Sequence, residues 1–177
     1  MRLVALVALT WILGVTQAAA WQEYIYLDQG FAIQFPGAAK PAVTSGAYKS
    51  ALAKNLKSNA YSLEDEHVIY RMTVVDLTAQ PDRGANFLNE AAYNLMREGD
   101  VLFTDFPRVY QEEKAIYGVT LVVGRTNGQR VRTSLYYNKG RLYQADAIVL
   151  PARGDKDMTT PSRFDQTVRF PPDGRFD

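Results

Sequence analysis

The sequence predicts a single α+β domain, in which an antiparallel β-sheet carries one long helix and a short C-terminal helix. Most of its apolar segments alternate with a period of two, which is typical of strands. One segment, residues 84–98, instead repeats its apolar residues at helical spacing. On each side of this helix the strand-like segments follow one another through short turns, which favours antiparallel pairing.

Residues 1–20 precede this domain and have the three-part layout of a secretory signal peptide. Arg2 supplies the positive charge, residues 3–15 form an apolar run, and Ala18-Ala19-Ala20 provides small residues for cleavage. The run is shorter than the roughly 20 residues that a spanning helix needs. We therefore expect cleavage after Ala20, or after Ala18, with no membrane anchor left on a mature chain that begins near Trp21.

Cysteine is absent from the sequence. A lipoprotein anchor and disulfide bonds are therefore both excluded, and the exported domain must be held by its core alone. The three-alanine end of the leader is typical of bacteria, so the expected location is the periplasm, with release into the medium as the alternative. Without residues 1–20, which contain one arginine, the chain has 19 basic and 19 acidic residues. This balance argues against a nucleic-acid partner.

The first half of the domain is predicted to begin with strands and to end in the long helix. Turn residues at 28–30 separate the first two strands, and an acidic turn at 64–67 separates the next two. The weakly patterned segment 38–58 is expected to be extended and to hold an edge strand. The expected strands are 21–27, 31–35, 59–63 and 68–77. The expected helix, residues 84–98, has Phe87, Leu88, Ala91, Ala92, Leu95 and Met96 on one face.

The second half is predicted to be a β-meander closed by a short helix. Asn127-Gly128 is a strong signal for a two-residue hairpin turn. Thr160-Pro161 has the cap and first-turn residues of a helix start, so a helix is expected over 161–168. The expected strands are 101–110, 113–126, 129–137 and 141–150. The domain is expected to span 21–170, with a loose tail at 171–177.

Candidate catalytic residues are not evident in the sequence. His67 is the sole histidine, and it follows Glu64-Asp65-Glu66 in what is better interpreted as a solvated turn than as a metal site. One histidine rules out a two-histidine metal site, and no cysteine rules out thiol catalysis. We therefore expect no catalytic residue, no metal and no cofactor.

A set of arginines and tyrosines in the meander is the best candidate for ligand binding. If Asn127-Gly128 is a two-residue loop, Arg125 lies opposite Arg130, and Arg132 shares that face. Tyr136, and Tyr143 across the next hairpin, fall on the same face. Such a patch suits a carboxylate, a phosphate or a sugar acid. The alternative is that these arginines decorate an exposed hairpin and pair with acidic residues elsewhere.

Three stretches together resemble the PsbP-like fold family. They are Gly30-Phe31-Ala32-Ile33-Gln34-Phe35-Pro36-Gly37, Gly140-Arg141-Leu142-Tyr143, and the segment from Arg163-Phe164 to Val168-Arg169-Phe170. The family occurs among photosynthetic extrinsic proteins and small bacterial envelope proteins. The resemblance implies an antiparallel sheet with helices on its faces and, by analogy, an accessory role. It carries over no functional residue.

The leading hypothesis is therefore a soluble periplasmic domain that acts by binding, with an envelope protein or a small anion as its partner. A small anionic-ligand binder is the first alternative. The second is a hydrolase whose active site is assembled from distant residues.

Overall fold

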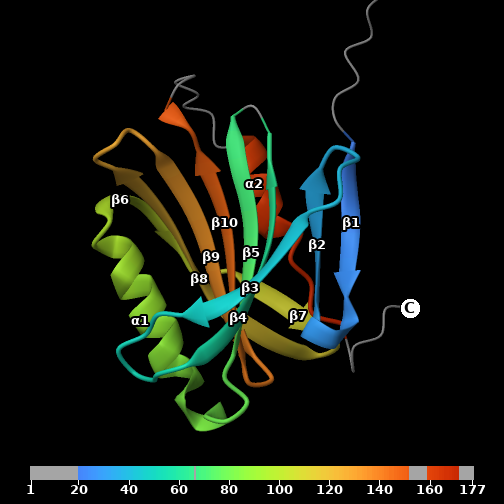
Figure 1. The fold of residues 1–177 in the computed structure, drawn as a ribbon, viewed down its shortest axis with the longest axis vertical. Coiled ribbons are helices and arrows are strands. Elements are labelled where there is room, and N and C mark those ends of the chain that lie inside the picture. The colour runs from blue at the N-terminus through green and yellow to red at the C-terminus, as the bar shows by residue number, and fades with distance from the viewer. Residues whose placement is uncertain (1–19, 66, 152–158, 172–177) are drawn as a thin grey trace, which may run out of the picture.

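The computed structural model, which describes residues 20–65, 67–151 and 159–171, confirms an α+β fold built on an antiparallel sheet (Figure 1). In chain order the elements are β1 (Trp21–Tyr26), η1 (Leu27–Gln29), β2 (Phe31–Pro36), β3 (Ala42–Tyr48), β4 (Leu56–Glu64), β5 (Val68–Asp76), η2 (Pro81–Arg83), α1 (Gly84–Met96), β6 (Gly99–Asp105), β7 (Arg108–Gln111), β8 (Lys114–Arg125), β9 (Arg130–Asn138), β10 (Arg141–Val149) and α2 (Thr159–Gln166). The long helix and the short C-terminal helix lie where the sequence predicts them.

The main sheet has the strand order β3-β4-β5-β10-β9-β8-β6. Strand β7 pairs with the first residues of β8, Lys114 to Tyr117. Every one of these pairings is antiparallel. The last strand of the meander, β10, lies at the centre between β5 and β9. The segments before and after α1 therefore join in one sheet, whose edges are β3 and β6.

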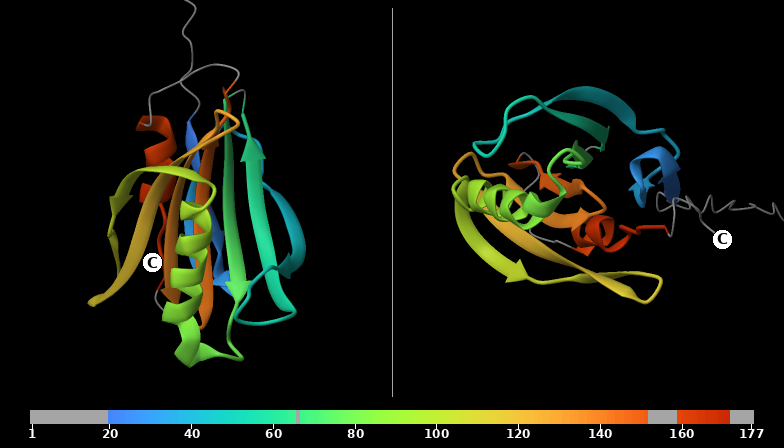
Figure 2. Two further views of the ribbon diagram at one scale, coloured as in Figure 1. Left: turned by 90° about the vertical axis from the view of Figure 1, so that its left-hand side faces the viewer. Right: turned by 90° about the horizontal axis from the view of Figure 1, so that it is seen from below.

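Each face of the main sheet is covered by a different element, as Figure 2 shows in the view from below. Helix α1 packs on one face with Phe87, Ala91 and Leu95, which meet Leu121, Leu135 and other strand residues. Helix α2 and the two-stranded β1–β2 sheet cover the other face. In the central strands, residues of both parities are therefore buried, those on one face in the core under α1 and those on the other in the core under α2 and β1–β2.

The core under β1–β2 is rich in aromatic rings. Phe31 stacks on Tyr26 and meets Tyr61 and Tyr143 edge to face, with ring centroids 4.9–6.1 Å apart. From α2, Phe164 meets Phe35 edge to face and contacts Tyr70 at a tilted angle. Such ring pairs add about 0.5–1.5 kcal/mol each beyond burial of their area. They hold the N-terminal hairpin on the sheet in the absence of any disulfide.

Two boundaries differ from the sequence-based expectation. The strand expected over 101–110 is broken at Phe106-Pro107 into β6 and β7, because proline lacks the N–H that a ladder needs. Pro171, expected in a loose tail, is buried, and its carbonyl accepts a hydrogen bond from the Gln111 side chain. The rest of that tail, residues 172–177, lies outside the described residues.

Residues 1–19 of the expected signal peptide, 1–20, also lie outside the described residues, whereas Ala20 and Trp21, on either side of the main predicted cleavage point, are described. Within the part of the chain that is described, neither helix is long and apolar enough to cross a membrane.

Candidate functional site

The hairpin between β8 and β9 contradicts the predicted placement of Arg125. Its loop has three residues, 126–128, because the N–H of Arg125 bonds to the carbonyl of Gln129 at 2.8 Å. Arg130 is therefore paired with Gly124 and not with Arg125. A shift of one residue moves a side chain to the opposite face of a sheet. Arg125 accordingly lies on the α1 face, where its Nε donates to Glu98 at 2.8 Å.

Arg132 lies on the α2 face but is held by a carboxylate. Its Nε and Nη2 donate to the two oxygens of Asp165, on α2, at 2.7 and 3.0 Å. Ser134 donates to the same carboxylate at 2.7 Å and is itself 2.6 Å from the Thr120 hydroxyl. Asp165, Ser134 and Thr120 are buried. This cluster therefore fixes α2 to β8 and β9.

Tyr136 and Tyr143 share the α2 face, as the sequence predicts, and pair directly across β9 and β10. Both side chains are buried in the aromatic core. Burial is the main cause that raises the pKa of Tyr136 to about 12, and the nearby Asp165 raises it further. Ligand binding by Arg125, Arg130, Arg132, Tyr136 and Tyr143 stays a prediction, but the structure does not bring the five together.

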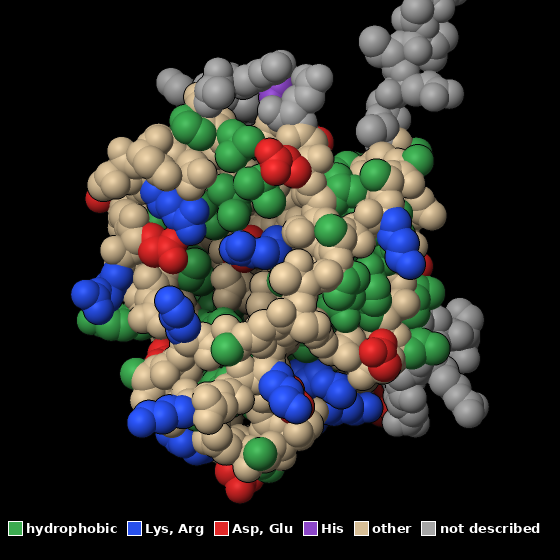
Figure 3. Space-filling model, viewed as in Figure 1, with side chains coloured by type: hydrophobic (Ala, Val, Ile, Leu, Met, Phe, Trp, Pro, Cys, Tyr) green, Lys and Arg blue, Asp and Glu red, His purple; other side chains and the backbone are tan. Residues whose placement is uncertain are grey.

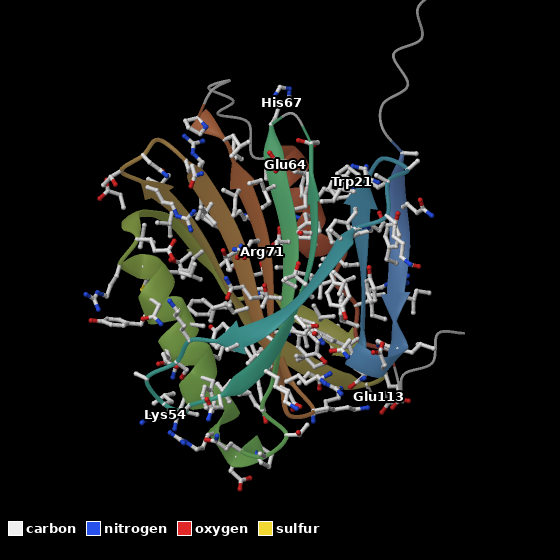
Figure 4. The ribbon with its side chains drawn as sticks, in the orientation of Figure 1. Trp21, Lys54, Glu64, His67, Arg71 and Glu113 are labelled. Atoms are coloured by element: carbon white, nitrogen blue, oxygen red, sulfur yellow. The ribbon has the colours of Figure 1, made fainter. Side chains whose placement is uncertain are left out.

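A second buried carboxylate lies on the α1 face of the sheet. Asp146 accepts hydrogen bonds from Arg71 at 3.1 and 2.8 Å, from Thr133 at 2.8 Å and from Gln144 at 2.9 and 3.2 Å. Figure 4 places Arg71 in the middle of the sheet. Both oxygens of the Asp146 carboxylate accept hydrogen bonds from neighbouring side chains, so we interpret this network as structural.

Glu64, Asp65 and His67 lie at the tip of the β4–β5 hairpin (Figure 4). The Asp65 carboxylate accepts hydrogen bonds from the N–H groups of His67 and Val68 at 2.8 and 2.7 Å. The Asp65 carboxylate therefore closes the turn. Among the described residues, no three acidic or histidine side chains gather in a way that would hold a metal ion.

Exposed large apolar side chains are concentrated on β6, the β6–β7 connection, β7 and the start of β8, a segment here called the β6–β7 edge. Leu102 is 55%, Phe106 70% and Tyr117 65% exposed. The members of the edge are Val101, Leu102, Phe103, Phe106, Tyr110 and Tyr117. Only five other large apolar residues are comparably exposed in the described part of the chain, and they are spread over the rest of it.

The backbone of this edge disfavours simple strand addition. Among the described strands, β6 pairs with β8 alone, so its outer edge is open. The ladder shifts between Val101 and Phe103, which inserts Leu102 as a bulge. A bulge interrupts the regular row of backbone donors and acceptors and is a common protection against edge-to-edge pairing. A partner would therefore contact the side chains more than the backbone.

Acidic side chains border the β6–β7 edge. Asp100 and Asp105 lie on β6, and Glu112 and Glu113 form the turn between β7 and β8. All four are exposed, and Figure 4 shows Glu113 at this turn. Arg108 and Lys114 are the basic residues of the same segment, so acidic charge predominates.

The β6–β7 edge does not stand out in the sequence, whose pattern predicts one ordinary strand over 101–110. The available signal was the run Val101-Leu102-Phe103 followed by Phe106, which does not alternate with polar residues. Consecutive apolar residues in a strand with only one covered face leave some of them in solvent.

Comparison with known proteins gives a likeness of fold. No family model matches the chain, and neither does any curated protein. The solution structure of cyanobacterial PsbP (CyanoP) from Synechocystis sp. PCC 6803 is similar over 89% of this chain and 95% of its own, with a TM-score of 0.49 and 14% identity. It belongs to the fold family that the three sequence motifs resemble. At this identity the likeness concerns the fold alone.

Proposed function

We propose that this protein is an exported, non-catalytic accessory protein that binds a second protein of the cell envelope through the β6–β7 edge. The observation that carries the proposal is the concentration of exposed large apolar side chains on this edge. Apolar patches of this kind, rimmed by polar residues, mark sites of interaction.

The size of the edge fits a protein partner. Its six side chains expose on the order of 600 Å², taking an aromatic side chain as about 150–250 Å². Each partner contributes roughly 800 Å² to a standard interface. Aromatic residues such as Phe106, Tyr110 and Tyr117 are also the types enriched in the centres of interfaces.

The charge of the rim favours a protein over a membrane surface. Asp100, Asp105, Glu112 and Glu113 would be repelled by anionic lipid, whereas a protein with basic residues around an apolar contact would be attracted. The proposed partner is therefore a protein whose contact surface is apolar at its centre and basic at its border.

Site-specific photocrosslinking in the native envelope tests this function. A photoreactive phenylalanine analogue at Phe106 should give one discrete adduct, and the same analogue at Val43, which is exposed on the opposite edge strand β3, should not. Glu112→Lys with Glu113→Lys should weaken the adduct. An adduct of twice the chain's mass, equal adducts from both positions, or no adduct from Phe106 would contradict the proposal.

Export is the other part of the proposal. Sequencing the N-terminus of the protein recovered from the periplasmic fraction should give Trp21 or Ala19 as the first residue. Recovery only from the cytoplasm, with Met1 retained, would contradict export.

A further inference from the structure

A polar hollow lies between the β1–β2 turn and the strands β3, β4, β5 and β10. None of the residues that line it belongs to the β6–β7 edge. The hollow has a volume of about 290 Å³, and Arg141 also lines a second hollow of about 270 Å³ on its other side. Ligand pockets in proteins have volumes of about 300–1,000 Å³, so the first hollow lies at the small end of this range and suits only a small molecule. Figure 3 shows Lys and Arg side chains gathered at this end, next to the turn between β1 and β2.

Arg141 is held in place by the backbone of the turn that covers it. Its Nη2 donates to the carbonyl of Asp28 at 3.2 Å, and Tyr143 donates to the carbonyl of Gln29 at 2.9 Å. A Cβ on Gly30 would lie 3.2 Å from the Tyr143 hydroxyl, so this turn sits close against both side chains. The guanidinium retains further donors after this bond, because arginine has five N–H groups.

The charges in the hollow favour a ligand with one negative charge. Lys57 and Arg141 contribute two positive charges and Asp76 one negative charge. Asp76 uses one oxygen to accept from the N–H and the hydroxyl of Thr78, at 3.0 and 2.6 Å. The wall therefore carries a net positive charge of one, with the arginine able to bind a carboxylate through two hydrogen bonds.

The uncharged part of the hollow suits hydroxyl groups. The Ser45 hydroxyl donates to Asn59 at 2.7 Å, and the Asn59 amide donates to Gln29 at 3.3 Å. The side-chain amide nitrogens of Asn59 and Gln29 each carry two protons, and the Ser45 hydroxyl oxygen has lone pairs that can accept a hydrogen bond. The wall thus offers donors and acceptors side by side, which is what a ligand hydroxyl needs because it acts as both.

From this geometry we infer that the hollow between Lys57, Asn59 and Arg141 binds a small hydroxylated monocarboxylate of the sugar-acid class. The carboxylate lies against Arg141 and Lys57, and the hydroxyl groups lie against Ser45, Asn59 and Gln29. This site is separate from the β6–β7 edge, so its occupancy does not depend on the protein partner.

Calorimetric titration of the purified protein with glucuronate tests the site. Glucuronate should bind, and glucose, which lacks the carboxylate, and acetate, which lacks the hydroxyl groups, should each bind at least tenfold more weakly. Lys57→Gln should weaken glucuronate at least fivefold. Lys54→Gln is the matched control, because it makes the same change of charge three residues earlier, in the connection before β4 and outside the lining of the hollow, and should leave binding unchanged.

The variants also keep the test independent of folding. Lys57 is exposed, so its replacement leaves the core intact, and Arg141→Lys retains the charge while losing the paired hydrogen bonds. Equal losses for Lys54→Gln and Lys57→Gln would overturn the site in favour of general charge attraction. Tighter binding of inorganic phosphate than of glucuronate, or no binding of glucuronate, would overturn the ligand class.

Discussion

Arg132 on β9 and Asp165 on α2 form a buried ion pair in which two nitrogens of the guanidinium meet the two carboxylate oxygens at 2.7 and 3.0 Å. The two residues are 33 positions apart in the chain. Because Ser134 also bonds to Asp165, the pair is part of a satisfied polar cluster inside an otherwise apolar interface.

Replacing Asp165 by alanine should destabilise the protein by about 3–5 kcal/mol, because it leaves the Arg132 charge in a buried place without its partner. Urea unfolding followed by circular dichroism measures the loss. Glu23→Ala is the matched control, since its partner Arg169 is exposed and such pairs contribute about 0–1 kcal/mol. Equal losses in the two variants would show that the buried pair has no special role.

Gly84→Ala should destabilise the protein by about 1–3 kcal/mol through overpacking. Gly84 begins α1 with ordinary helical angles, so backbone strain is not the cause. A Cβ there would lie 2.1 Å from the ring of Tyr137, which is fixed by a 2.6 Å hydrogen bond from its hydroxyl to the carbonyl of Pro81. Gly46→Ala, with nothing within 4 Å of the added carbon, should be stable in the same thermal unfolding assay. An unchanged midpoint for Gly84→Ala would contradict this account.

Thr78→Val should destabilise the protein at neutral pH more than at acid pH. The Thr78 side-chain hydrogen bond is the main cause that lowers the pKa of Asp76, with the Thr78 N–H next. A folded-state pKa below the unfolded value contributes stability above about pH 4, and this contribution is lost as the pH falls through the folded-state pKa. The effect is at most about 1 kcal/mol because Asp76 is exposed. Urea midpoints of both proteins at pH 7 and pH 2.5 measure it, and an equal difference at the two pH values would refute it.

Tyr61 should ionise late in an alkaline titration. Burial raises the pKa of Tyr61 to about 12, with Asp28 the second cause. Because the neutral phenol is favoured in the folded state, this contribution to stability is full below pH 10 and is lost as the pH rises towards 12. In absorbance at 295 nm, Tyr61→Phe should remove one tyrosine equivalent from the late phase and leave the early phase unchanged. Loss from the early phase would show that Tyr61 titrates as an exposed residue.

The pattern of residues was sufficient to predict the strand and helix content and the position of α1. Four of the six residues of its apolar stripe, Phe87, Ala91, Ala92 and Leu95, are buried against the sheet and Leu88 is partly buried, whereas Met96 at the end of the helix is 40% exposed. The pattern was also sufficient for the pairing of Tyr136 with Tyr143, since the short turn between β9 and β10 fixes the register.

The predicted ligand site depended on information that is absent from the local pattern. The dipeptide Asn127-Gly128 is compatible with loops of two or three residues, and the pairing of β8 with β9 selects three. One added loop residue places Arg125 on the face opposite Arg132. Likewise, the polar hollow at Arg141 unites residues from five separate elements, whose proximity no spacing along the chain reveals.

What the sequence determined by itself was therefore the period of each segment, and with it the α+β architecture. The tertiary structure alone decided which face each arginine occupies, which apolar residues of β6 stay exposed, and which polar residues meet at Arg141. The physical reason is that periodicity is a local property of a strand or helix, whereas register and exposure depend on which segments, far apart in the chain, bury it.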